Sequence, residues 1–300
     1  MQGIFNFSEI EGSEIIIQKT WGDFRQLLSN KVFRYDDIEA ALQATFLRVF
    51  DDLFQHGHRF FAKRVGDVLS PTVSITRAAR IEGSDPTPTY ERFIPKAEFI
   101  ASDNRFSPPG IEWLYLAFAP AEANFPFSVD ETCALKECRA AAGEHFALCE
   151  FKSADKYQNH LLIDLTIAKE TEFNDINSAL EEAGQKITKR EIKEGIRVGT
   201  KTGRIPKVQV EDIKPALEKW AVFTYAKLLA EQIFVPISTE DRELMYAPFQ
   251  CMAQYFLSKG YIGIIYSSTV FPAGKNIVLF DKHAAVPYGS IKTVNIPAEF

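Results

Sequence analysis

The sequence lacks the features of a secreted or membrane-spanning protein. Only four of its 300 residues are cysteines, and none forms a Cys-x-x-Cys pair, so the thiols are expected to be reduced. No stretch approaches the roughly 18 consecutive apolar residues of a transmembrane helix. The first residues, MQGIFNFSEIEGSE, are acidic and lack the basic start and apolar run of a signal peptide. We therefore predict a cytoplasmic protein without membrane contact.

The common motifs for nucleotides and metals are absent as well. No Gly-x-Gly-x-x-Gly follows a predicted strand, which disfavours a dehydrogenase-type dinucleotide site, and no Gly-rich loop ends in Lys-Ser/Thr. His56 and His58 stand two residues apart, but no third ligand is indicated nearby, so we predict no metal site. The net charge of −6 disfavours direct binding of nucleic acid.

What remains is an ordinary globular composition, 46% hydrophobic and 25% charged. Residues 1 to about 70 are predicted to form a helical N-terminal region. Within residues 36–57, apolar side chains recur at helical spacing and form a phenylalanine-rich stripe. This stripe is expected to pack on a neighbouring helix or on the rest of the chain. The alternative is a surface for a partner or for self-association into a homo-oligomer.

From about residue 71 the pattern changes to strands separated by helices. The predicted strands are 73–81, 113–119, 145–151, 161–167, 261–268 and 276–281. The predicted helices are one around Glu137 with Asp130 as its N-cap, one at 210–234, and one at 248–260 opened by Pro248. The last 19 residues are predicted to be irregular. The pattern indicates an α+β fold over residues 71–300.

A polar stretch at about 170–212 interrupts this pattern. Residues 186–207 contain eight Lys/Arg against two Glu, together with three glycines. We expect a solvated surface insertion, with a docking site for an acidic partner as the alternative.

Several side chains in residues 71–300 stand in contexts that suit a binding cleft. Arg105 precedes a Pro-Pro-Gly turn, and Tyr115 lies on a predicted buried strand. Glu137 lies in a helix, while Tyr266 and Ser268 share one face of a later strand. Each of them alone has an ordinary structural explanation. Their joint order and local contexts carry the functional hypothesis.

That order resembles the signature of the RES-domain toxins, which are named for an arginine, a glutamate and a serine. The matching residues are Arg105, Phe106, Gly110, Tyr115, Glu137, Tyr266, Ser268, Gly274 and Asn276. An earlier arginine also belongs to the pattern, and Arg77 is the preferred match, with Arg80 as the alternative. Because Arg77 and Arg80 are three residues apart on a strand, at most one should face the cleft. The resemblance covers roughly residues 73–282, with Ser107 where asparagine is common.

The resemblance implies a split mixed β core flanked by helices, like the fold of ADP-ribosylating toxins. It also implies an enzyme that consumes NAD as its substrate and needs no further cofactor. The arginines (Arg77 or Arg80, and Arg105) would hold the pyrophosphate, since guanidinium groups suit paired phosphate oxygens. Tyr115 would pack against the nicotinamide–ribose portion, and Tyr266 and Asn276 would help to bind NAD.

In the same resemblance, Glu137 would orient the ribose and stabilise its developing positive charge, as carboxylates do in glycoside hydrolysis. Ser268 would hydrogen-bond the ribose or nicotinamide. The implied function is a toxin that cleaves the nicotinamide–ribose bond and is held in check by a cognate antitoxin protein. Transfer of ADP-ribose to a protein, and a non-catalytic interaction role on a RES scaffold, are the alternatives. The acceptor is left open between water, phosphate and a protein side chain.

Overall fold

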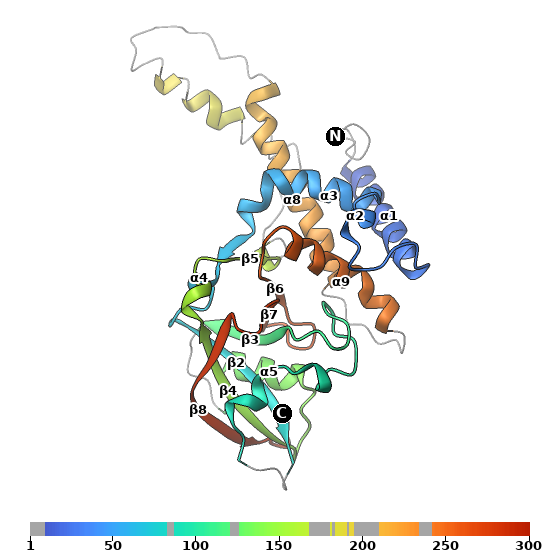
Figure 1. Ribbon diagram of the computed structural model, residues 1–300. Coiled ribbons are helices and arrows are strands. Elements are labelled where there is room, and N and C mark those ends of the chain that lie inside the picture. The colour runs from blue at the N-terminus through green and yellow to red at the C-terminus, as the bar shows by residue number, and fades with distance from the viewer. Residues whose placement is uncertain are drawn as a thin grey trace.

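A mixed eight-stranded sheet and a group of helices at one end of it make up the molecule (Figure 1). The computed structural model describes residues 10–82, 87–120, 126–167, 181, 184–190, 192–194, 210–233 and 242–300. Helices and a sheet occur together in one chain, so the predicted α+β class is confirmed. Most of the predicted basic insertion at 170–212 lies outside the described residues.

The strands of the sheet are ordered β1-β5-β6-β7-β3-β2-β4-β8. They are β1 (Ala62–Arg64), β2 (Val73–Ile81), β3 (Leu114–Pro120), β4 (His145–Ser153), β5 (Leu161–Asp164), β6 (Gly263–Ser267), β7 (Lys275–Leu279) and β8 (Ala285–Asn295). The β5–β6 pair is parallel, and the other pairs are antiparallel. Strands far apart in sequence therefore lie side by side in the middle of the sheet, where β7 pairs with β3.

The helices lie above the sheet and on one of its faces. They are α1 (Ile10–Ser29), α2 (Ile38–Ala41), α3 (Thr45–Gly57), α4 (Val65–Val68), α5 (Val129–Glu137), α8 (Val210–Ile233) and α9 (Arg242–Ser258), with short 3₁₀ turns at His58–Phe60, Tyr90–Phe93, Ala97–Phe99 and Asp155–Tyr157. α5 packs on β2 and β3, while α1, α3, α8 and α9 gather at the end near β5 and β6 (Figure 1).

The phenylalanine-rich stripe is buried within the chain. In α3 its members Phe46, Phe50 and Phe54 are each at most 5% exposed. Their rings contact Tyr225 of α8 and Tyr255 of α9. The first expectation for the stripe, packing inside the molecule, is therefore confirmed. Self-association through these rings receives no support, because the same chain already covers them.

The end of the chain was expected to be irregular, and this expectation was wrong. β8 (Ala285–Asn295) forms the edge of the sheet and pairs with β4 along most of its length. Pro287 and Gly289, where φ is +71°, give this segment the composition of a loop. A strand at the edge of a sheet tolerates both residues. Its side chains are mostly exposed, so no clear hydrophobic alternation marks it.

Helix boundaries also differ from the sequence-based expectation. α9 begins at Arg242, so Pro248 lies inside the helix rather than at its start. The expected helix at 36–57 is divided into α2 and α3, and β1 lies within the region expected to be helical. These differences arise because packing on the core decides where a helix begins, and proline alone does not. None of the described helices combines the length and apolarity that crossing a membrane requires.

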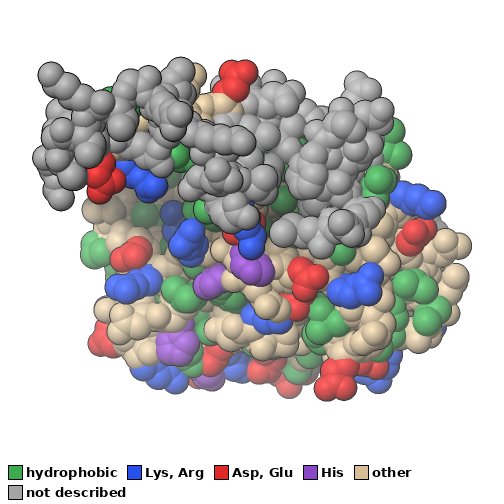
Figure 2. All heavy atoms as spheres, turned by 90° about the horizontal axis from the view of Figure 1, so that it is seen from above, with side chains coloured by type: hydrophobic (Ala, Val, Ile, Leu, Met, Phe, Trp, Pro, Cys, Tyr) green, Lys and Arg blue, Asp and Glu red, His purple; other side chains and the backbone are tan. Residues whose placement is uncertain are grey.

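Charged groups are mixed on the surface seen from the helical end of the molecule. Figure 2 shows acidic and basic side chains of the described residues interspersed over this face, with hydrophobic side chains between them. On the part of this face that is not grey, neither sign of charge is concentrated.

Candidate functional site

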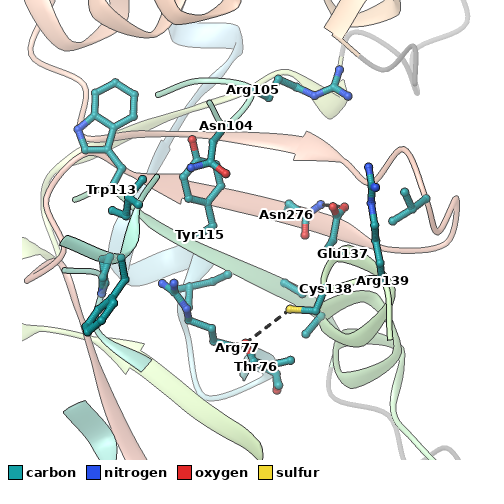
Figure 3. Close-up of a pocket in the computed structure, with 18 of the residues that line it drawn as sticks. Thr76, Arg77, Asn104, Arg105, Trp113, Tyr115, Glu137, Cys138, Arg139 and Asn276 are labelled. Carbon is teal, nitrogen blue, oxygen red and sulfur yellow. Dashed lines mark hydrogen bonds between the residues drawn. The ribbon is translucent and has the colours of Figure 1, made fainter. Parts of the chain in front are cut away.

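A cavity of about 550 Å³ opens beside β2, β3 and the end of α5. Its volume is in the range of small-molecule sites. Of the eight residues predicted for the site, six line it: Arg77, Arg105, Tyr115, Glu137, Tyr266 and Asn276. Figure 3 shows Glu137 and Asn276 on one side of this space, with Arg77 and Tyr115 on the other. Residues from five separate segments thus meet at one place.

Glu137 is the last residue of α5, and two side chains from distant strands hold its carboxylate. The Ser268 hydroxyl donates to Oε1 at 2.7 Å, and the Asn276 amide donates to the same oxygen at 2.5 Å. Glu137 is exposed to the cavity, so its carboxylate is fixed without being enclosed. No hydrogen bond to Oε2 occurs among the described residues, which leaves this oxygen available to a ligand.

The start of α5 fixes the position of this helix on the sheet. Ser128, rather than the expected Asp130, is the N-cap, and it forms a capping box with Glu131. Asp130 is instead buried and accepts hydrogen bonds from Thr76 on β2, at 2.5 Å, and from Ser128, at 2.6 Å. The helix carrying Glu137 is thereby tied to the strand residue that precedes Arg77.

Arg77 reaches the cavity with part of its guanidinium unsatisfied. Its Nη1 is buried and has no hydrogen-bond partner among the described residues. Burial lowers the pKa of this guanidinium from its ordinary value. A buried donor without an acceptor is costly, so a site of this kind favours an anionic ligand.

Arg80 does not line the cavity, which corrects its inclusion among the binding residues. It is exposed, pairs with Glu144 at 3.0 Å and lies over the ring of Phe146. The three-residue spacing from Arg77 sends the two side chains to opposite faces of β2, as the sequence predicts for a straight strand.

Arg105 extends toward α9. Its guanidinium lies 5.8 Å from the ring centre of Tyr246 and 5.9 Å from that of Phe249. Cation–π contacts of this kind hold a guanidinium in place. Tyr246 also lines the cavity. Sequence reasoning missed it because it does not belong to the family pattern, and the expected helix began only after it, at Pro248.

Tyr115 and Tyr266, the two tyrosines predicted for the site, line the cavity. Burial raises the pKa of Tyr115, whose hydroxyl lies 2.9 Å from Ser107 Oγ. Burial, together with the nearby charge of Glu137, raises the pKa of Tyr266. The Tyr266 ring contacts Phe106 edge to face. Both phenols therefore remain neutral at pH 7 and can serve as hydrogen-bond donors rather than as bases.

Ser268 lies behind Glu137 and is not among the residues that line the cavity. Its Oγ accepts from the backbone N–H groups of Val270 and Phe271 while donating to Glu137. This position suits a residue that orients the carboxylate. The expected direct contact of Ser268 with ribose or nicotinamide stays a prediction.

The charge of the cavity is opposite to that of the whole chain. Five basic side chains line it: Arg77, Arg92, Lys96, Arg105 and Arg139. Among the described residues only two acidic side chains do so, Asp103 and Glu137, whereas the chain carries a net charge of −6. Clefts lined by one sign of charge attract ligands of the other sign. No group of three or more metal-ligating side chains occurs among the described residues.

Comparison with known proteins gives one family match. Residues 175–297 match the model of the RES domain. This range includes Tyr266, Ser268 and Asn276, and it begins after Glu137, so it is shorter than the expected range. No curated protein matches the chain.

Among solved structures, the toxin–antitoxin complex MbcT–MbcA of M. tuberculosis is similar at 10% identity and a TM-score of 0.35. The similarity covers 82% of this chain and 93% of that one. A likeness this distant carries no weight for function or fold. The family match covers less than half of the chain and shows that residues 175–297 are similar to the RES domain.

Proposed function

We propose that the protein is a toxin that degrades NAD by cleaving the bond between nicotinamide and ribose. The observation that carries this proposal is the cavity in which Arg77, Arg105, Tyr115 and Glu137 converge. A dinucleotide offers two negative phosphates, a ribose and an aromatic base. The cavity offers guanidinium groups, a fixed carboxylate and aromatic walls that are complementary to these parts.

The carboxylate accounts for the chemistry. When nicotinamide leaves as a neutral pyridine, positive charge develops on the ribose. Glu137 is held by Ser268 and Asn276, so it needs little reorganisation to stabilise that charge. It can do so directly or by accepting a hydrogen bond from a ribose hydroxyl through the unengaged Oε2. The neutral phenols of Tyr115 and Tyr266 close the site and donate hydrogen bonds.

The arginines account for substrate binding. Arg77 presents a buried Nη1 that has no acceptor in the described part of the chain, and Arg105 is positioned by aromatic contacts. In the proposal both guanidinium groups bind the pyrophosphate, and NAD is a substrate that needs no additional cofactor. Because a free enzyme of this kind would injure its host, we propose that a cognate antitoxin protein blocks the cavity.

Product analysis after incubation with NAD tests the reaction. Purified protein is expected to release nicotinamide together with free ADP-ribose, or with its phosphate ester when phosphate is the acceptor. Label retained on a macromolecule would instead favour protein ADP-ribosylation in the same cavity. Failure to bind or deplete NAD would favour a non-catalytic interaction protein.

Substitution separates catalytic from structural roles. Arg105→Ala and Glu137→Ala are each expected to lower NAD turnover by at least about a hundredfold, because each removes a charged group that faces the substrate. Arg80→Ala is the matched control, since Arg80 lies on the same strand as Arg77 but outside the cavity. Thermal melting should be nearly unchanged in all three variants. Retained turnover in the Glu137 variant would contradict the assignment.

A further inference from the structure

Arg139 has a backbone conformation that is unusual for a residue with a side chain. Its φ is +54°, in the left-handed region. It directly follows Cys138, the C-cap of α5, and its N–H donates to Lys136 O at 2.9 Å. The next N–H, of Ala140, donates to Leu135 O at 3.0 Å. These two bonds form a Schellman motif, in which the left-handed position is usually glycine.

Glycine would adopt this backbone conformation with less strain than the arginine that occupies position 139. A side chain in the left-handed region brings Cβ close to the neighbouring carbonyl, a strain that glycine avoids. Residues held in such conformations concentrate at functional sites. The backbone alone does not assign a role, however, because strain is also found elsewhere.

The position of the Arg139 side chain points to a ligand independently of the backbone conformation. Arg139 lines the same cavity as Glu137, which stands two residues earlier. Its guanidinium forms no hydrogen bond or ion pair with any residue that the structure describes. In Figure 3 the Arg139 side chain lies on the Glu137 side of the cavity, across from Arg77. Arg139 therefore adds a further guanidinium to the wall of the cavity, beside Glu137.

We propose that Arg139 is a substrate-binding residue that donates to the phosphate nearest the ribose held by Glu137. This deepens the proposed function and rests on it for the identity of NAD. The 5′ phosphate of a nucleotide is attached to the same ribose that Glu137 would contact, so adjacent cationic and anionic side chains suit these two groups. A guanidinium at this point binds a phosphate by charge-assisted hydrogen bonds.

Arg139→Gly separates this role from a structural one. The variant should melt about 1–3 °C higher, because glycine relieves the left-handed strain. Its kcat/KM for NAD should fall about tenfold or more, mainly through KM, and its affinity for ADP, measured by calorimetry, should fall similarly. Turnover of nicotinamide riboside, which has no phosphate, should be unchanged. Arg139→Lys should retain most of the ADP affinity without the gain in melting temperature.

The chain contains a matched control at the end of α1. Lys31 has a φ of +55° and ends that helix with the same two bonds, from Lys31 N to Leu28 O and from Val32 N to Leu27 O, both at 3.0 Å. It does not line the cavity. Lys31→Gly should therefore raise the melting temperature similarly and leave NAD kinetics and ADP binding unchanged.

The outcomes distinguish the two proposals. If wild-type protein binds ADP through Arg139 but does not cleave NAD, the proposed reaction fails and the binding role stands. If Arg139→Gly binds ADP and NAD as wild type does, the inference is overturned while the proposed reaction survives. Wild-type protein that binds neither nucleotide overturns both.

Discussion

At the scale of single residues, one carboxylate connects three parts of the chain. Glu137 ends α5, while its two hydrogen-bond donors come from the residue that follows β6 and from β7. Ser268 and Asn276 therefore orient the same oxygen from the sheet side. Because each donor is neutral, the arrangement holds a negative charge without cancelling it, as a group that stabilises positive charge on a substrate requires.

Asn276→Asp tests this arrangement. The substitution keeps the shape of the side chain but places a second carboxyl group beside Glu137. In the wild type this position holds the Asn276 amide, whose nitrogen lies 2.5 Å from Glu137 Oε1. Two carboxyl groups this close share a proton, so one of them remains protonated near neutral pH. We expect NAD turnover to fall about tenfold or more at pH 7 and to recover partly at higher pH, as measured in a pH–rate profile.

The control for that profile is Asn276→Ala, which removes the donor without adding a charge. Its loss of turnover should be independent of pH between about 6 and 9, because it introduces no titrating group. If the Asp and Ala variants gave the same profile, Asn276 would not be acting through the carboxylate of Glu137.

At the scale of elements, the sequence predicted best those segments whose periodicity is set by burial. β2 occupies the predicted residues 73–81, and β3 and β4 differ from prediction by a few residues at most. Each has buried side chains on at least one face, which gives a clear pattern. β8 was missed because an edge strand with exposed side chains has no such pattern.

In the candidate site, too, local sequence patterns identified individual residues but could not show which of them meet in space. The family pattern indicated Glu137 and Ser268, but their hydrogen bond joins residues 131 positions apart and depends on the order of the strands. Tyr246 and Arg139 were missed because neither belongs to that pattern. Positive φ at a non-glycine residue, the feature that distinguishes Arg139, is visible only in coordinates.

Contacts between elements also predict a pH dependence of stability. Asp51 of α3 pairs with Lys259 at 2.6 Å and accepts from Tyr255 of α9 at 2.8 Å. Burial alone would raise the pKa of Asp51, but the hydrogen bonds from Lys259 and Tyr255 outweigh it and hold the pKa below its ordinary value. The stabilisation is therefore present above the pKa of an unfolded aspartate, about 4, and is lost as pH falls through the lower, folded value.

Asp51→Asn should therefore lower the free energy of unfolding at pH 7 by about 1–3 kcal/mol, because it removes a charged acceptor shared by three donors, Lys259, Tyr255 and Gln55. The difference from wild type should shrink as pH falls from about 5 to 3, as measured by urea unfolding at each pH. Asp52→Asn is a neighbouring control, since Asp52 forms no ion pair among the described residues. A difference that stayed constant with pH would contradict the role of the Asp51 charge.

At the scale of the whole molecule, the N-terminal helices and the sheet share one core. A single cluster of buried residues includes Trp21 of α1, Phe50 of α3 and Tyr255 of α9 together with Ile163 and Ile264 of the sheet. β1, from the same N-terminal region, pairs with β5. The division into an N-terminal region, residues 1–70, and a second domain, residues 71–300, stays a prediction. The contacts between them indicate that each part depends on the other for its stability.

Removal of residues 1–60 tests this dependence. The deletion takes away α1, α2 and α3 and exposes the aromatic faces of α8 and α9 that they cover. Each large buried side chain contributes about 1.5–3 kcal/mol, so a loss on this scale exceeds the usual net stability of a folded domain. We expect the shortened chain to aggregate or to bind a hydrophobic dye, without a cooperative calorimetric transition, whereas the full chain melts in one transition. A shortened chain that melts cooperatively and still consumes NAD would show instead that the sheet and its cavity form an independent unit.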